Sequence, residues 1–131
     1  MQLKQYSGFP FPAVQKGPQG ALRYVKENTT ALIKSSIAQI LLTAKGERPW
    51  NPEFGCDLTR FLFEVANPAD METIQNICYD AIVRWEPRVR LSPLDIVVAP
   101  SQTDPGRLSV SISYQEVTKT KPSKESLTLT I

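Results

Sequence analysis

Apolar residues recur at helical spacing early in the chain. After the possible N-caps at 28–30, five of them lie 0, 4, 7, 8 and 11 positions along: Ile33, Ile37, Ile40, Leu41 and Ala44. This spacing places them on one face of a helix of about three to four turns. Gly46 follows at the position where a left-handed C-cap often ends a helix. The pattern therefore predicts an amphipathic first helix that leads into a loop rich in glycine and proline.

Two further helices are predicted between residues 57 and 86. Asp57 is a candidate N-cap of a short second helix. Its inward residues are expected to be Leu58, Phe61 and Leu62. Asn67 and Pro68 suit the cap and the first position of a third helix. Its apolar face consists of Ile74, Ile77, Cys78, Ala81, Ile82 and Trp85. Pro87 ends this helix, because proline lacks an amide hydrogen and disfavours helical geometry at the residue before it.

From residue 93 onward the apolar residues alternate with polar ones. Three such segments lie at 94–98, 108–114 and 127–131, separated by loops of proline, glycine and serine. Alternation of this kind is typical of antiparallel strands with one apolar face. Helices first and strands afterwards predict an α+β fold, with three helices packed on one face of a small antiparallel sheet.

Residues 1–20 have a different character. Prolines and glycines alternate with aromatic residues there, as in Phe9-Pro10-Phe11-Pro12, which predicts an extended proline-rich arm. We interpret the chain as a single domain over 1–131. It comprises the arm at 1–20, a helical part at 28–86 and antiparallel strands at 93–131.

Composition agrees with one soluble domain and excludes several functions. At 131 residues the chain can bury about two-thirds of its unfolded surface without a metal or a disulfide. Fifteen basic and thirteen acidic residues leave a net charge of +2, so neither a nucleic-acid partner nor insertion into a membrane is expected. The N-terminal residues lack the apolar core of a secretory signal, and we expect the protein to work where it is made.

The residues that carry common chemistry are scarce. There is no histidine, which excludes Ser-His-Asp and Cys-His pairs and histidine-bearing zinc sites. Cys56 and Cys78 are too few for a four-ligand zinc site and are expected to be reduced and partly buried. Four carboxylates lie close in sequence, without the controlled separation that a glycosidase needs: Glu47, Glu53, Asp57 and Glu64. We therefore expect no enzyme, no cofactor and no metal, and keep a carboxylate-based hydrolase as the less favoured alternative.

Two motifs lie on either side of the third predicted helix. One stretch runs from "ILLTAKGER" at 40–48 through "PEFGCDL" at 52–58 to "LFE" at 62–64, and the other is "AIVRWEPRV" at 81–89. Together they resemble the baseplate wedge and sheath-initiator family of contractile phage tails. That family includes phage baseplate assembly protein W and its relatives in contractile injection systems and type VI secretion. The likeness covers about residues 9–117.

The resemblance implies a structural role. Family members are expected in six copies where the baseplate meets the tail tube or hub and the first sheath ring, with baseplate wedge proteins and sheath subunits as partners. It implies assembly in the bacterial cytoplasm and a final place in the virion or injection particle. The wedge-docking turn carried over to this chain consists of Glu86, Pro87 and Arg88. The second family motif consists of Gly46, Glu47 and Arg48.

The docking turn also has a physical basis in the residues. Pro87 stiffens the corner, so that an arginine fork at Arg88 can make directional bonds to a partner's carboxylate or backbone carbonyls. The alternative is that Glu86 and Arg88 pair within the fold, for instance with Arg48 and Glu47.

The last strand offers a second contact. No charged residue follows Glu125, so this strand lacks the charge or proline that usually protects a sheet edge. The resemblance implies that a sheath arm pairs with it, through Leu127, Thr128, Leu129, Thr130 and Ile131. An interior strand with two neighbours is the alternative. A small adaptor that binds an unrelated peptide at its sheet edge is the alternative function.

Overall fold

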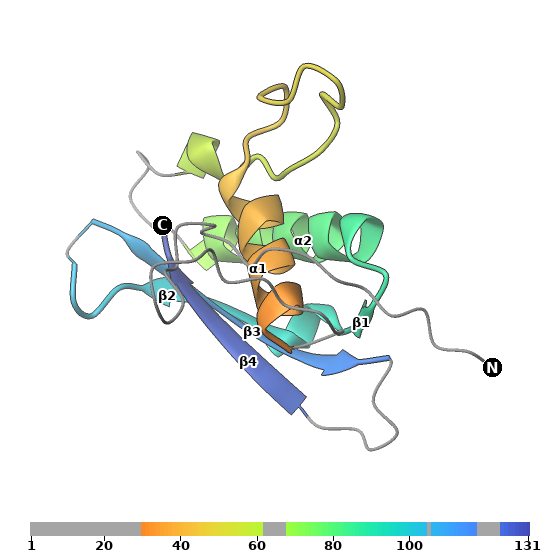
Figure 1. Cartoon of the computed structure of the whole chain (residues 1–131). Helices are drawn as coiled ribbons and strands as arrows, with labels where there is room; N and C mark the ends of the chain where they lie inside the picture. The colour runs from red at the N-terminus through yellow and green to blue at the C-terminus, as the bar shows by residue number, and fades with distance from the viewer. Residues whose placement is uncertain (1–29, 62–67, 105, 118–123) are drawn as a thin grey trace, which may run out of the picture.

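The computed structural model describes residues 30–61, 68–104, 106–117 and 124–131 (Figure 1). Two α-helices, α1 (Thr30–Leu42) and α2 (Pro68–Trp85), precede a four-stranded antiparallel sheet. The α+β class is confirmed, and the expectation of three helices is wrong. In the described residues the predicted second helix is a 3₁₀ turn, Leu58–Phe61, in which Leu58 is buried, and short segments commonly adopt 3₁₀ geometry. Leu62, which was expected to point inward, lies outside the described residues. The proline-rich arm at 1–20 lies outside the described residues.

Helix α1 buries the predicted face and ends earlier than its apolar pattern. Ile33, Ile37 and Ile40 are at most 1% exposed. The helix stops at Leu42, and Gly46 uses its positive φ of 85° inside the following loop and not as a helix cap. Ala44 is therefore a loop residue. The amide of Thr43 still donates to Gln39 of the helix, but the carbonyls of Thr43 and Ala44 accept hydrogen bonds from Cys56 and Glu47 of the loop, so the helix does not continue.

Helix α2 follows the prediction closely. Ile74, Cys78 and Ile82 are at most 2% exposed, and Pro68 occupies the first helical position. The backbone amide of Glu86 donates to the carbonyl of Ile82 at 2.8 Å, which is the last helical bond before Pro87. None of the helices in the described ranges is long and apolar enough to span a membrane.

The sheet has four strands, β1 (Val89–Arg90), β2 (Ile96–Pro100), β3 (Leu108–Glu116) and β4 (Lys124–Thr130). β3 is central: β1 and β2 pair with successive parts of one edge, and β4 pairs with the other. The predicted meander is therefore confirmed as β2–β3–β4. The two-residue β1 was not expected from the sequence.

Leu94 does not belong to the apolar face, contrary to the alternation at 94–98. Pro93–Asp95 form a 3₁₀ turn, in which Asp95 accepts hydrogen bonds from the backbone amide and the hydroxyl of Ser92. This turn leaves Leu94 86% exposed. Strand β2 consequently begins at Ile96.

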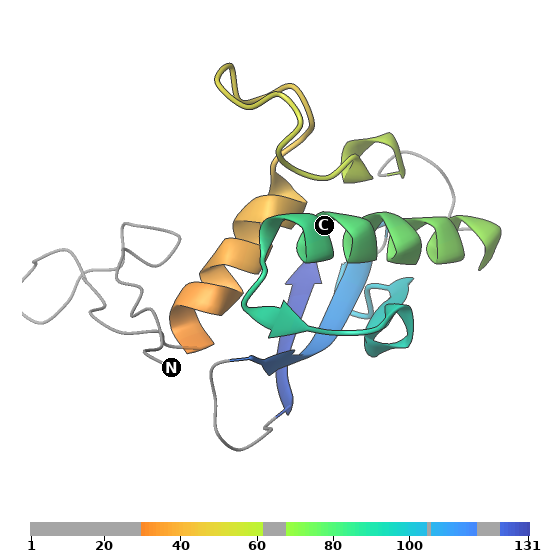
Figure 2. The ribbon, with the colours of Figure 1, turned by 90° about the vertical axis from the view of Figure 1, so that its right-hand side faces the viewer.

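The helices cover one face of the sheet, as seen from the side in Figure 2. The core lies between the two layers. From the sheet, Val110, Ile112 and Tyr114 of β3 are at most 1% exposed and meet the buried faces of α1 and α2. The opposite face carries the serines of β3 and the exposed Val97.

Candidate docking surface

The corner at residues 86–88 is held by backbone bonds on both sides. It follows the last residue of α2 directly and leads into β1. The carbonyl of Arg88 accepts a hydrogen bond from the amide of Val117 at 2.9 Å, and Val89 pairs with Glu116 of β3. Pro87, which fixes its own φ, is exposed at the apex. The corner is therefore a stiff link between helix and sheet.

Glu86 and Arg88 bind each other across this corner. Arg88 donates from Nε to Oε1 and from Nη2 to Oε2 of Glu86, both at 2.6 Å. The Glu86 side chain is 2% exposed and the Arg88 side chain 16%. Within the folded chain Glu86 and Arg88 therefore pair with each other, whereas Glu47 and Arg48 bind elsewhere in their own loop and helix.

The electrostatics of the pair favour an ionised carboxylate. Burial alone raises the pKa of Glu86. Hydrogen bonds from Arg88 and Ser36 and the positive charge of Arg88 outweigh it, so that the pKa of Glu86 lies below its usual value. The guanidinium is accordingly oriented by a charged, buried partner.

The second motif shapes the loop after α1. Glu47 accepts a hydrogen bond from the amide of Ala44 at 3.0 Å. Arg48 lies over the ring of Phe54, 3.9 Å from its centroid, and reaches Gln39 of α1 at 3.5 Å. Gly46 donates to the carbonyl of Pro52 at 2.7 Å across the loop. The motif residues therefore bind within the loop and its helix.

The base of this loop is closed by a close backbone approach. Cys56 donates from its amide to the carbonyl of Thr43 at 2.8 Å. Gly55 adopts a φ of 113°, and a Cβ atom there would lie 2.2 Å from the same carbonyl oxygen. Only glycine fits such a position without a shift of the backbone.

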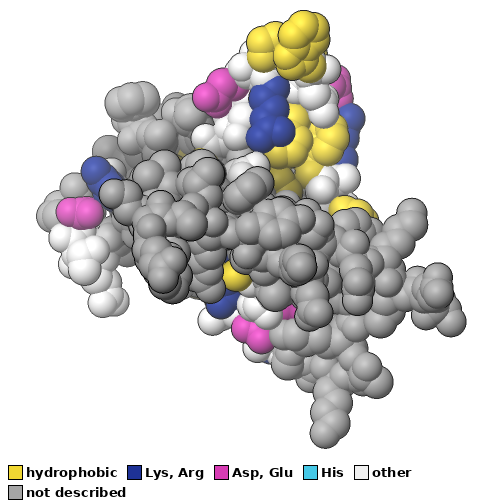
Figure 3. All heavy atoms as spheres, in the orientation of Figure 1, with side chains coloured by type: hydrophobic (Ala, Val, Ile, Leu, Met, Phe, Trp, Pro, Cys, Tyr) yellow, Lys and Arg dark blue, Asp and Glu magenta, His cyan; other side chains and the backbone are white. Residues whose placement is uncertain are grey.

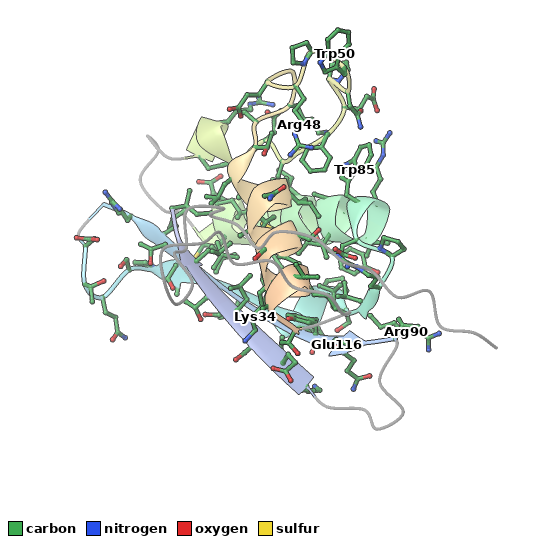
Figure 4. All side chains as sticks on the ribbon, in the orientation of Figure 1. Lys34, Arg48, Trp50, Trp85, Arg90 and Glu116 are labelled. Carbon is green, nitrogen blue, oxygen red and sulfur yellow. The ribbon has the colours of Figure 1, made fainter. Side chains whose placement is uncertain are left out.

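Side chains that the sequence reasoning missed connect the loop to the end of α2. Phe54 and Trp85 pack with their ring centroids 5.2 Å apart, and Arg84 binds Glu53 through Nη2 and Oε2 at 2.7 Å. Figure 4 shows Arg48 and Trp85 on this side of the molecule. All four residues lie within the two stretches that carry the family resemblance. Their shared membership of these stretches could have suggested that the stretches contact each other. These contacts attach the loop to the last turn of α2, directly before the corner at 86–88.

Strand β4 lies at an edge of the sheet. It pairs with β3 from Lys124 to Thr130, and in the described part of the chain β3 is its only neighbour. Leu127 and Leu129 point toward the core, whereas Thr128 and Thr130 are exposed. Ile131 lies beyond the strand but exchanges both backbone hydrogen bonds with Leu108, at 2.8 and 3.0 Å.

The other candidate groups serve local structure. Of the four carboxylates, Glu47 and Glu53 bind within the loop and to α2, and Glu64 lies outside the described residues. Cys56 and Cys78 are free thiols, as expected, but fully buried. Across the described ranges, no three His, Cys, Asp or Glu side chains gather in a way that could hold a metal ion.

These features define a small α+β protein with three candidate contact surfaces: the corner at 86–88, the loop after α1 and the edge of β4. The family described as baseplate wedge protein gp25 matches residues 27–121. The chain belongs to this family of structural baseplate components of contractile tail systems.

Two curated relatives come from phages. The chain is 38% identical to baseplate wedge protein gp25 of Enterobacteria phage T4 over 65 residues, 50% of this chain and 49% of the relative. It is 34% identical to baseplate protein W of Escherichia phage P2 over 83 residues, 63% of this chain and 69% of that protein. The match thus spans about half the length of the T4 protein.

Solved structures share the fold. A Geobacter sulfurreducens protein described as a putative tail lysozyme is 33% identical, with a TM-score of 0.61 over 74% of this chain and 86% of that one. A chain of the anti-feeding prophage baseplate is 21% identical, with a TM-score of 0.71 over 89% and 90%. A chain of the type VI secretion baseplate complex is 14% identical, with a TM-score of 0.56 over 72% and 87%. The last two likenesses concern the fold alone.

Proposed function

We propose that this protein docks on the baseplate wedge through the corner at 86–88 and initiates the contractile sheath by pairing β4 with a strand of a sheath subunit. The observation that carries the proposal is the edge position of β4, which pairs along its whole length with β3 on one side. The protein has no catalytic role in this proposal. Six copies lie near the tail tube or hub, and each of them binds one subunit of the first sheath ring. It is assembled in the bacterial cytoplasm and remains in the baseplate of the particle.

In this proposal the two charged residues of the docking corner have different roles. Glu86 is buried and acts as a positioning residue for Arg88. Pro87 and the partly exposed Arg88 side chain supply the surface that meets the wedge. A guanidinium held in one orientation loses little freedom on binding, which favours a directional contact.

The hydrogen-bond pattern of β4 identifies the groups offered to a sheath strand. Because Leu108 and Ile131 exchange both backbone bonds, alternation in an antiparallel pair gives Leu129 and Leu127 the next inward bonds to β3. The amides and carbonyls of Ser126, Thr128 and Thr130 therefore point to the open edge. An added strand gains affinity from these groups, and the leucines on alternate positions fix its register.

A proline at Thr128 tests this proposal. Thr128→Pro removes an outward amide hydrogen and leaves the inward bonds to β3, since proline is tolerated where an edge strand faces solvent. Thr128→Val keeps the amide and is the matched control. Particles should be produced in cells with each variant and imaged by electron cryomicroscopy. We expect baseplates without sheath for Thr128→Pro and normal sheath for Thr128→Val.

Full-length sheath on Thr128→Pro baseplates would contradict the strand-pairing role. Circular dichroism and thermal unfolding of both purified variants are the control that tests whether each variant retains the fold. If particles from wild-type cells are found not to contain this chain, the baseplate role is overturned, and an adaptor that binds another peptide is favoured.

A further inference from the structure

Trp50 is the most exposed large apolar side chain in the described part of the protein, at 97% exposure. It lies at the tip of the loop that joins α1 to the 3₁₀ turn, and this loop projects beyond the end of α1, away from the sheet (Figures 1 and 2). Figure 4 shows Trp50 at its extremity. Neither the corner at 86–88 nor the edge of β4 gives this residue a role.

Backbone hydrogen bonds hold the loop around Trp50 in two turns. Asn51 donates from its amide to the carbonyl of Arg48 at 3.2 Å, which makes a turn with Pro49 and Trp50 at its centre. Phe54 donates to the carbonyl of Asn51 at 3.1 Å and forms a second turn directly after it. With the closed base at Gly55, these bonds fix the backbone that carries Trp50 and keep its side chain away from the rest of the protein. A partner that binds Trp50 therefore meets a preformed loop and does not have to order the backbone.

The charges around the tip are unequal. Glu53 is paired with Arg84, and Glu47 is occupied by the amide of Ala44. Arg48 and Lys45 have no ion pair within the described ranges. Figure 3 shows the apolar tip above a cationic side chain, with acidic side chains to either side of it. The tip therefore offers an apolar knob with positive charge next to it, and tryptophan and arginine are the residue types enriched at binding hot spots.

The loop also has a fixed place relative to the docking corner. The Phe54–Trp85 and Glu53–Arg84 contacts attach it to the last turn of α2, immediately before Glu86. The base of the loop and the corner at 86–88 therefore keep a constant position relative to each other.

We propose that Trp50 inserts into an apolar pocket, rimmed by carboxylates, on the wedge protein that receives the corner at 86–88. This inference rests on the proposed wedge docking and adds a second, independent contact to it. The corner supplies directional polar bonds, and Trp50 supplies the apolar anchor.

The test measures binding of the full chain to wedge complex purified from cells that produce the particle. We expect Trp50→Ala to weaken binding by about 30-fold or more, as for a hot-spot residue. Trp50→Phe should lose less. Leu94→Ala, which removes another highly exposed apolar side chain, is the matched control and should bind as the wild type does. Raising the salt concentration should slow association, because the carboxylate rim attracts the cations next to Trp50.

The possible outcomes separate the two proposals. Wild-type affinity of Trp50→Ala, with weakened binding of Arg88→Lys, would overturn the Trp50 contact and leave wedge docking in place. Wild-type chain that does not bind the wedge complex would overturn both. Trp50-dependent flotation with anionic phospholipid vesicles, or Trp50-dependent self-association in sedimentation, would instead assign the knob to a membrane or to a second copy and would overturn the wedge assignment.

Discussion

Removing Arg88 should expose how much the corner depends on its ion pair. Arg88→Ala deletes two hydrogen bonds of 2.6 Å and the countercharge of a carboxylate that is 2% exposed. Breaking a buried pair in this way typically costs about 3–5 kcal/mol, because the remaining charge stays buried without its partner. Arg88 retains 16% exposure and Ser36 still bonds to Glu86, so we expect a loss of about 2–4 kcal/mol of unfolding free energy.

Urea unfolding followed by circular dichroism measures this loss, and a double-mutant cycle with Glu86→Gln isolates the pair. Arg88→Ala in a Glu86→Gln background should cost much less than in the wild type, since the buried group is then neutral. We expect a coupling energy of at least about 1.5 kcal/mol. A change below about 0.5 kcal/mol for Arg88→Ala, or strict additivity of the two substitutions, would refute the reasoning.

The pH dependence gives an independent check. The pKa of Glu86 is lowered by folding, so its stabilising contribution is present above the unfolded pKa of about 4.3 and is lost as the pH falls through the folded pKa. The difference in stability between wild type and Arg88→Ala should therefore be largest near neutral pH and shrink below about pH 4. A difference that does not change with pH would contradict the role of ionised Glu86.

Three further substitutions are expected to change stability in urea unfolding. Gly55→Ala should cost at least about 2 kcal/mol, because its Cβ meets the Thr43 carbonyl at 2.2 Å, whereas Gly46→Ala, with open space around it, should cost only about 1 kcal/mol. Tyr114→Phe should be neutral or stabilising by up to about 1 kcal/mol, since the buried hydroxyl has no hydrogen-bond partner within the described ranges. Ile37→Ala should cost about 2–5 kcal/mol, because Ile37 is completely buried between the layers.

The helix faces and the meander were predictable because each depends on local periodicity. Ile33, Ile37 and Ile40 repeat at helical spacing, and Leu127 and Leu129 alternate with polar residues. Burial of one face then selects helix or strand without knowledge of the remaining chain. The end of α2 was equally local, since Pro87 alone prevents its continuation.

The errors have a common cause in contacts over a few residues that compete with periodicity. Asp57 suits an N-cap, yet the segment after it forms a 3₁₀ turn at Leu58–Phe61 and not an α-helix. Leu94 fits an alternating strand, but the Ser92–Asp95 hydrogen bonds form a turn there and expose it. The alternation of side chains contains no information about such competing bonds.

The resemblance indicated which motifs to consider, at 46–48 and 86–88, but contained no information about their geometry. Which side chains bind each other depends on the folded chain. Glu86 binds Arg88 because α2 ends directly before the corner and β1 begins directly after it. The Phe54–Trp85 contact joins residues 31 positions apart, for which the sequence gives no distance information.

The central position of β3 has a consequence for the order of folding. β1, β2 and β4 each pair with β3, and Glu116 at its end accepts a hydrogen bond from Thr30 at the start of α1. Within the described residues no strand can join the sheet before β3 is in place. We therefore expect the transition state of folding to include β3 with at least one neighbouring strand, so that a destabilising substitution in the centre of β3 slows folding more than it accelerates unfolding in stopped-flow measurements. The corner at 86–88 and the edge of β4 both depend on the same strand, so we expect the two surfaces to form together when the protein folds.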